Sequence, residues 1–284
     1  MLGTVDQPGV IARVLPAGLR EILRAWWTRR DLVVQFTLRD IRLRTRGTAL
    51  GFLWSFLQPL LLLSVFTVVF SVVLKVRWTD MVDEPTKVFA LKLYAGFLLY
   101  EVVGSSMSSA PNLLVSNSNL VKKVVFPLSV LPLSNVLAAG FFGLANLFVL
   151  IVATLALTGS LPVTAIWAPL TAAPVVALAY GVSSFVSSIS VYVRDMRPFV
   201  ASFLVLVLMY CSPIFYPLDR VPENLRLVLQ FNPLTPIIEQ TRGALWGVAP
   251  DPGQLALSAG VCVVLAVVGH LVFRSLKEGF ADAL

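Results

Sequence analysis

The longest uncharged stretch of this sequence covers positions 124–193, where no Asp, Glu, Lys or Arg occurs in 70 consecutive residues. As a single helix it would be roughly 105 Å long at about 1.5 Å per residue, several times the ~30 Å apolar thickness of a bilayer. The stretch must therefore fold back at least once, and residues 158–162 (Thr-Gly-Ser-Leu-Pro) provide the turn signal. Such a segment requires lipid as its solvent, which indicates an integral membrane protein.

The rest of the chain follows the same pattern, since hydrophobic types make up 57% of the residues and charged types only 13%. The sequence predicts an all-α integral membrane protein of six transmembrane helices in one domain. A tail and interface helices (1–47) precede the six-span core (48–274), and a short tail (275–284) follows it. The expected spans are 48–74, 88–110, 126–157, 166–191, 199–215 and 254–273.

The basic residues flank the apolar spans and do not form a soluble domain with stacking aromatics, so the net charge of +7 does not indicate nucleic acid binding. With six crossings, one face of the membrane carries 15 Lys and Arg residues and the other carries seven. The positive-inside rule therefore predicts that both termini lie in the cytoplasm.

An amphipathic helix is expected before the first span, because apolar residues at positions 19, 22, 23, 26 and 27 fall on one helix face between basic flanks. Such a helix lies in the membrane interface with its tryptophans at headgroup level. Asp31 can cap a second short helix with an arginine-rich side. The residues expected at the interface are Trp26, Trp27, Arg39, Arg42 and Arg46. Positive-inside anchoring alone remains an alternative explanation of the arginines.

The segment from position 216 to position 251 is too polar for an ordinary span, with four prolines before Glu239 and several charges. Short helices at 223–230 and 236–246 fit it better, and they can dip back into the membrane where protein covers them.

The sequence contains no phosphate-binding G-x-x-x-x-G-K-[ST] loop, so the chain cannot hydrolyse ATP through that motif. We expect no catalytic residue, no disulfide and no metal site, because His270 is the single histidine and Cys211 and Cys262 lie in apolar runs. Glu101 is an isolated carboxyl group inside the second span. It is interpreted either as a polar contact in a translocation path or as a carboxylate at headgroup level.

The connection between the second and third spans combines small polar residues, an apolar pair and two lysines, and it is typical of a helix that docks in a partner's groove. The candidate docking residues are Ser116, Asn117, Asn119, Leu120, Lys122 and Lys123. A simple anchoring loop is the alternative.

Three ordered blocks of this sequence resemble the permeases of bacterial polysaccharide ABC exporters of the O-antigen and teichoic-acid type. The first block is Arg39-Asp40-Ile41-Arg42-Leu43-Arg44 with Leu50-Gly51-Phe52-Leu53-Trp54 and Gln58-Pro59-Leu60. The second is Asn119-Leu120-Val121-Lys122-Lys123-Val124 with Phe126-Pro127. The third is Ser212-Pro213-Ile214-Phe215-Tyr216-Pro217 with Asn232-Pro233-Leu234-Thr235-Pro236 and Arg242.

This resemblance implies a permease that pairs with a second copy of itself and with two copies of a cytoplasmic ATPase, which would bind ATP and Mg. Residues 116–123 would be the coupling helix and residues 19–46 the interface helix. The gate helices would lie in 216–246, with Tyr216, Pro217, Asn232, Pro233 and Arg242. Trp54, Phe66, Phe70 and Glu101 are the candidate channel-lining residues, although packing or lipid contact explains the three aromatics equally well. Glu101 departs from the apolar or aromatic residue expected at its position.

The leading hypothesis is therefore export of a lipid-linked polysaccharide (O-antigen, teichoic acid or a capsule-like glycan) across the bacterial cytoplasmic membrane. The chain would need no cofactor of its own, because a separate ATPase subunit would supply the energy. An ion-coupled secondary transporter is an alternative, with Glu101 as its only candidate titratable group. A membrane-embedded glycan-processing enzyme is a second alternative, and it would need convergent carboxylates or a metal that the sequence does not offer.

Overall fold

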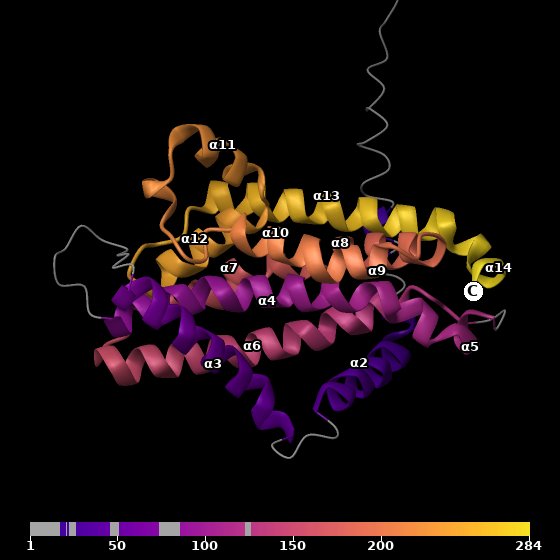
Figure 1. Ribbon diagram of the computed structural model, residues 1–284, viewed down its shortest axis with the longest axis horizontal. Coiled ribbons are helices and arrows are strands. Elements are labelled where there is room, and N and C mark those ends of the chain that lie inside the picture. The colour runs from indigo at the N-terminus through magenta and orange to yellow at the C-terminus, as the bar shows by residue number, and fades with distance from the viewer. Residues whose placement is uncertain (1–17, 21, 23–26, 46–50, 74–85, 123–125) are drawn as a thin grey trace, which may run out of the picture.

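The computed structural model describes residues 18–20, 22, 27–45, 51–73, 86–122 and 126–284, and this part of the chain consists of helices joined by turns (Figure 1). Four segments are long and apolar enough to cross a membrane. They are α4 (Thr86–Ser116), α6 (Val130–Thr158), the segment Val163–Tyr192 that ends with α8 (Pro174–Tyr192), and the segment Pro252–Ala283 that begins with α13 (Pro252–Leu276). They confirm the prediction of a helical membrane protein.

Two shorter helical segments occupy the other predicted spans. α3 (Trp54–Thr67) continues as a π-helical turn over Val68–Val73. α9 (Met196–Phe199) leads through another π-helical turn, Val200–Leu204, into α10 (Val205–Tyr210). This helix ends at Tyr210, whereas the sequence pattern extends to position 215. A proline at 213 explains the early end, because proline donates no amide hydrogen bond and disfavours the helical conformation in the residue before it.

α4 is longer than predicted and continues past Pro111 to Ser116, where the sequence pattern suggests an end near position 110. Side chains satisfy carbonyl groups at its end. Asn117 Nδ2 donates to the Leu113 carbonyl (2.8 Å), and Ser116 Oγ donates to the Asn112 carbonyl (2.6 Å). These bonds give carbonyl groups in the last turn of α4 additional donors near the end of the helix, where amide donors run out.

The turn predicted at residues 158–162 is present. Gly159 adopts a left-handed conformation with φ of +75° directly after α6, and its amide donates to the Leu155 carbonyl (3.0 Å). Glycine takes this conformation without the steric penalty of a side chain. The uncharged stretch therefore folds back as a helical hairpin of α6 with the short α7 (Ala168–Ala172) and α8.

α4, α6, α8 and α13 lie side by side along the long axis of the molecule (Figure 1), with α4 packed on α6 and α8, and α8 packed on α13. The crossing of α8 and α13 depends on two glycines, because a methyl group on Gly269 would overlap the Gly181 carbonyl oxygen. Close approach through small residues is a common way for membrane helices to associate. His270 lies beside this crossing, buried, with its Nδ1 2.8 Å from the Tyr180 hydroxyl.

The two ends of the bundle carry different short helices. α5 (Ser118–Val121) and α14 (Phe280–Ala283) lie at one end, and α11 (Glu223–Phe231) and α12 (Leu234–Leu245) lie at the other (Figure 1). α11 and α12 match the short helices predicted at 223–230 and 236–246. The predicted docking and gate segments are therefore separated by the length of the spans.

Candidate functional site

The predicted docking segment is α5 and the residues on either side of it. Ser116, Asn119 and Lys122 are exposed, whereas Val121 is buried in an apolar cluster with Leu114, Leu128, Phe273 and Phe280, and Leu120 packs against this cluster. The apolar pair thus anchors α5 to the bundle. Polar side chains remain on the surface, where a partner can reach them. Lys123 lies outside the described residues.

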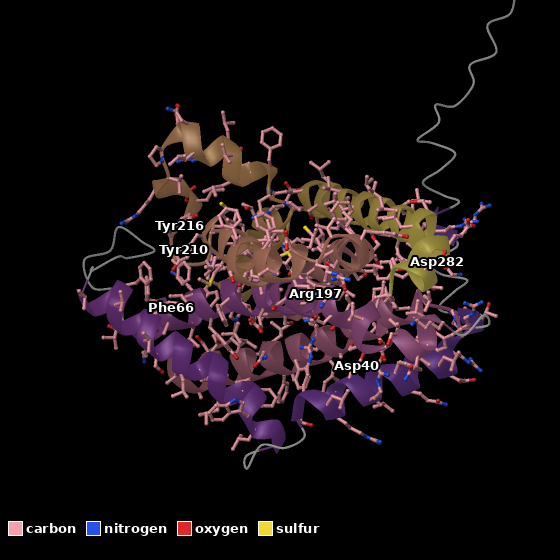
Figure 2. All side chains as sticks on the ribbon, turned by 45° about the vertical axis from the view of Figure 1, so that its right-hand side comes forward. Asp40, Phe66, Arg197, Tyr210, Tyr216 and Asp282 are labelled. Atoms are coloured by element: carbon pink, nitrogen blue, oxygen red, sulfur yellow. The ribbon has the colours of Figure 1, made fainter. Side chains whose placement is uncertain are left out.

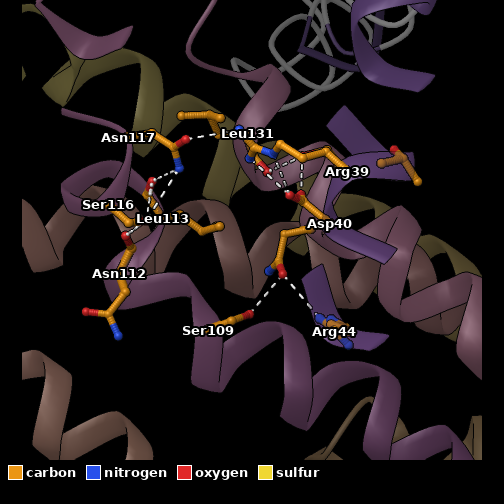
Figure 3. A network of polar contacts seen from close by, with 12 residues as sticks. Arg39, Asp40, Arg44, Ser109, Asn112, Leu113, Ser116, Asn117 and Leu131 are labelled. Atoms are coloured by element: carbon orange, nitrogen blue, oxygen red, sulfur yellow. Dashed lines mark hydrogen bonds and ion pairs between the residues drawn. The ribbon is translucent and has the colours of Figure 1, made fainter. Parts of the chain in front are cut away.

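α2 (Arg30–Thr45) is joined to this segment by Arg39. Arg39 Nη1 donates to Asn117 Oδ1 (3.1 Å), and Nη2 is 2.9 Å from Asp40 Oδ1 (Figure 3). The guanidinium group also lies 4.3 Å from the ring centroid of Phe36, a cation–π distance. The Phe36 ring in turn contacts the Phe126 ring at 5.4 Å. Arg39 therefore fixes α2 to the turn between α4 and α5.

A buried polar junction around Asn135 of α6 connects α2 to the spans. Arg44 Nη2 (3.3 Å) and Ser109 Oγ (2.9 Å) both donate to Asn135 Oδ1. Asn135 Nδ2 donates to the Ser106 carbonyl (3.1 Å) and to Ser183 Oγ (3.3 Å), so the one amide links α2, α4, α6 and α8. Figure 3 shows part of this network.

One residue before Asn135, Ser134 Oγ donates to Asp40 Oδ2 (2.8 Å) and gives α2 a second bond to α6. Neither Ser134 nor Asn135 is among the residues predicted from the sequence. The sequence did contain a signal for this junction, namely a Ser-Asn pair in an otherwise apolar run. Polar residues inside a span usually form hydrogen bonds with other spans.

The other predicted interface residues have different positions. Trp27 is 76% exposed, and Arg42 of α2 is exposed as well. Trp26 and Arg46 lie outside the described residues.

The predicted channel aromatics separate into two groups. Phe66 and Phe70 pack on Phe215, with ring centroids 4.8 Å and 5.1 Å away, and Tyr210 joins this cluster at 5.8 Å from Phe215. Figure 2 labels two members of the cluster, Phe66 and Tyr210. Trp54, at the opposite end of α3, is 41% exposed. Phe66 and Phe70 therefore hold α3 against the segment after α10, which is the packing role that the sequence left open.

The predicted gate segment is tied to the end of α10. Asn232 Nδ2 donates to the Cys211 carbonyl and to Ser212 Oγ, both at 2.9 Å, while its Oδ1 accepts the Leu234 amide (3.0 Å). The Tyr216 hydroxyl donates to the Tyr210 carbonyl (2.7 Å). Pro217 and Pro233 are half-buried. Pro217 immediately precedes a 3₁₀ turn at Leu218–Arg220, and Pro233 immediately precedes α12.

Among the charged site residues predicted from the sequence, Arg242 of α12 is the most deeply buried. It is 6% exposed and donates to the carbonyls of Lys92 (3.1 Å) and Pro213 (2.9 Å), and it pairs with Glu239 (2.8 Å). Burial lowers the pKa of Arg242 to about 10, because a charged guanidinium group loses hydration, while the Glu239 carboxylate opposes this shift. Arg242 remains charged at neutral pH and joins α12 to α4 and to the segment after α10.

Glu101 lies about halfway along α4 and is half-buried. Its carboxylate interacts electrostatically with Arg44 of α2, and within the described part of the chain it has no hydrogen bond or ion pair. The positive charge of Arg44 is therefore near Glu101, but no described residue donates a hydrogen bond to the Glu101 carboxylate.

These features define the class of protein: a multi-pass helical membrane protein with the short helix α5 at one end of its bundle and the helices α11 and α12 at the other. Residues 32–246 match the ABC-2 type transporter family, and the chain belongs to this family. It is accordingly a transport permease and not an enzyme.

Similar curated proteins carry a more specific description. Two proteins of Klebsiella pneumoniae, both named O-antigen export system permease protein RfbA, are 29% and 30% identical to this chain over 255 and 256 residues. Each alignment covers 89% of this chain and 95% of the relative. A protein of the same name from Myxococcus xanthus is 27% identical over 271 residues, which cover 93% of this chain and 99% of the relative.

Proposed function

We propose that this chain is the membrane-spanning subunit of an ABC exporter that moves a lipid-linked polysaccharide across the bacterial cytoplasmic membrane. The observation that carries the proposal is its similarity, over almost its whole length, to permeases named for O-antigen export. A cytoplasmic ATPase, present in two copies beside a dimer of this chain, would bind ATP and Mg. The missing phosphate-binding motif supports this division of labour.

In the proposed arrangement the chain crosses the membrane six times, and α3 and the α9–α10 segment are the two crossings outside the four longest helical segments. Both termini and α5 face the cytoplasm. The excess of Lys and Arg on that side and the common position of α5 and α14 support this topology. α11 and α12 then lie at the outer face as gate helices.

α5 is the proposed contact with the ATPase. Its apolar side is anchored in the bundle, and its exposed residue Asn119, together with the exposed flanking residues Ser116 and Lys122, is available to a groove on the partner. Because Arg39 and the Asn135 junction connect this turn to α2 and three spans, a displacement of α5 by the ATPase would be transmitted to the membrane helices. The coupling machinery is thus α5 together with α2.

Co-purification with candidate cytoplasmic ATPases of the same organism tests the proposal, with surface polysaccharide as the second measurement. Deletion of the gene should remove the surface polysaccharide, and Asn119→Arg in α5 should weaken ATPase association. Asn224→Arg is the matched control, since Asn224 is an exposed asparagine on α11 at the opposite end of the bundle. Normal surface polysaccharide in the deletion strain, or equal ATPase binding by both variants, would contradict the proposal.

A further inference from the structure

A pocket of about 320 Å³ lies at the end of the bundle that carries α5 and α14 (Figure 1). Three segments that are far apart in the sequence line it. Arg29 directly precedes α2, and Ser129 directly precedes α6. His270 and Arg274 belong to the last turns of α13, and Lys277 begins the 3₁₀ turn Lys277–Gly279 that follows. We call this site the basic pocket.

The basic pocket concentrates positive charge. Arg29, Arg274 and Lys277 are exposed around it, and none of the described residues that line it is acidic. Asp31, the carboxylate nearest to Arg29 in the sequence, lies 4.0 Å from Arg30. Three cations around one small pocket repel one another, so a bound anion would lower the free energy of this arrangement.

Hydrogen-bond donors are available at the same place. The side chains of Arg29 and Lys277 have no hydrogen bond or ion pair with the described residues. Ser129 is the N-cap residue of α6, yet its hydroxyl group makes no capping bond. Guanidinium, ammonium and hydroxyl groups all donate to phosphate oxygens in proteins. The positive end of the α6 helix dipole adds to the attraction for an anion.

The floor of the basic pocket is fixed by packing. His270 is 7% exposed, and its Nδ1 lies 2.8 Å from the Tyr180 hydroxyl at the crossing of α8 and α13. Phe273 is buried beside it and packs on Phe280, with ring centroids 5.4 Å apart. A ligand would therefore bind against a preorganised surface, and ordering would be needed mainly for the exposed cationic side chains.

The position of the basic pocket along the spans favours a lipid ligand. The apolar part of α13 ends at Phe273, and Arg274 and Lys277 follow. Trp27, two residues before Arg29, is 76% exposed, and tryptophans of membrane proteins are enriched at headgroup level. At this level the lipid headgroups are the nearest source of phosphate.

We propose that the basic pocket binds the phosphate group of an anionic phospholipid and that the bound lipid joins the start of α2, the start of α6 and the end of α13. The proposal does not depend on the proposed export function. Positive-inside anchoring and the α13 helix dipole account for Arg274 and Lys277 alone. They do not account for a third cation and an uncapped serine hydroxyl from two other segments that line the same pocket.

Thermal unfolding of the purified full-length chain in detergent tests whether such a lipid binds. Phosphatidylglycerol is the anionic probe and phosphatidylcholine the zwitterionic control, at equal concentrations in mixed micelles. We expect phosphatidylglycerol to raise the midpoint by about 3 °C or more relative to phosphatidylcholine, because a ligand that binds the folded state stabilises it. Equal midpoints with the two lipids would overturn the proposal.

A double variant tests the site. Arg29→Gln with Lys277→Gln removes two of the cations around the basic pocket. Arg30→Gln with Arg194→Gln is the matched control, because it removes two exposed positive charges outside this pocket. Titration of the midpoint shift should show at least about tenfold weaker phosphatidylglycerol binding by the pocket variant, since charge-assisted hydrogen bonds to phosphate are lost. Equal weakening by both variants would make the effect one of net charge and overturn the site.

Protection of an introduced thiol locates the bound phosphate. Ser129→Cys is made in a background with Cys211→Ser and Cys262→Ala, and its reaction with a water-soluble methanethiosulfonate is followed. Phosphatidylglycerol should slow this reaction about fivefold relative to phosphatidylcholine, because an occupied pocket shields the thiol. Ser275→Cys, at an exposed site of α13 that does not line the pocket, should react at the same rate with both lipids. Absence of protection at position 129 would place the lipid elsewhere and overturn the proposal.

Two further measurements identify the occupant. Inorganic phosphate added to phosphatidylcholine micelles should leave the midpoint unchanged, and a rise equal to that with phosphatidylglycerol would identify a soluble phosphate compound in place of a lipid. Loss of ATPase co-purification in the pocket variant, with an unchanged response to phosphatidylglycerol, would identify an acidic segment of the partner. Either result would overturn the proposal. Polysaccharide export is not measured in these experiments, so their failure leaves the proposed function standing.

Discussion

Arg39 Nη1 donates a hydrogen bond to Asn117 Oδ1 across 3.1 Å, and this contact joins α2 to the turn that leads into α5. The residues are 78 positions apart in the sequence and come from the two segments proposed to face the cytoplasm. A movement of α5 therefore changes the position of α2 directly.

Replacing Arg39 by Ala should reduce polysaccharide export by about fivefold, because a hydrogen bond of about 1 kcal/mol between α2 and the α5 turn is lost. The measurement is surface polysaccharide per unit of permease in the membrane. Arg42→Ala is the control, since Arg42 is exposed three residues further along α2 and its side chain has no hydrogen bond or ion pair with the described residues. Equal export by the two variants would contradict a coupling role for Arg39.

Replacing Asn135 by Leu should destabilise the protein by about 2 kcal/mol, because the hydrogen bonds that Asn135 makes with α2, α4 and α8 are lost together. The reduced midpoint of thermal unfolding in detergent is the measurement. Asn224→Leu, at an exposed site on α11, should leave the midpoint nearly unchanged. Similar midpoints for both variants would show that the junction contributes little.

Replacing Gly269 by Ala should destabilise the crossing of α8 and α13 by about 1–3 kcal/mol, since the added methyl group meets the Gly181 carbonyl. Gly260→Ala is the matched control, because it makes the same substitution in the same helix, α13. Apart from its chain neighbours and the nearby backbone of α13 itself, no described atom lies within 4 Å of the added carbon at Gly260, and alanine is the better helix former. We expect Gly260→Ala to match or exceed the thermal stability of the parent, and a lower stability for this control than for Gly269→Ala would refute the explanation.

Replacing Arg242 by Lys should loosen α12 although the charge is retained. A guanidinium group donates in several fixed directions and reaches both the Lys92 and Pro213 carbonyls, whereas an ammonium group cannot hold the same geometry. We expect a loss of about 2 kcal/mol and faster proteolysis between α11 and α13. Proteolysis at the parent rate would indicate that α12 is held by its apolar contacts alone.

Impermeant labelling of whole cells tests the topology. In a background without other cysteines, Asn224→Cys should react with an external maleimide, and Asn119→Cys should react only after the inner membrane is opened. The two sites belong to α11 and α5 at opposite ends of the spans, so they should never react from the same side. External labelling of the Asn119→Cys variant would reverse the topology and remove α5 from any cytosolic ATPase.

Most of the helices could be predicted from the sequence because hydropathy is a local property. The uncharged stretch from position 124 to 193 requires two membrane helices wherever they pack, and Gly159 marks the turn between them. The short helices α11 and α12 follow from the prolines and charges around them. The predicted end of the fifth span at position 215 was wrong. The helix ends at Tyr210, before Pro213, and the apolar Phe215 that suggested a longer span packs on Phe66 and Phe70.

The sequence by itself determined that this chain enters a membrane as several helices and that it contains no phosphate-binding loop for ATP, and it predicted that the basic connections gather on one side. The tertiary structure decided which polar groups meet: Arg39 with Asn117, Arg44 with Asn135, and Arg242 with the backbone of two other segments. The physical reason is that partition into lipid depends on each segment's own composition, whereas a hydrogen bond depends on two groups whose distance only the packed helices fix.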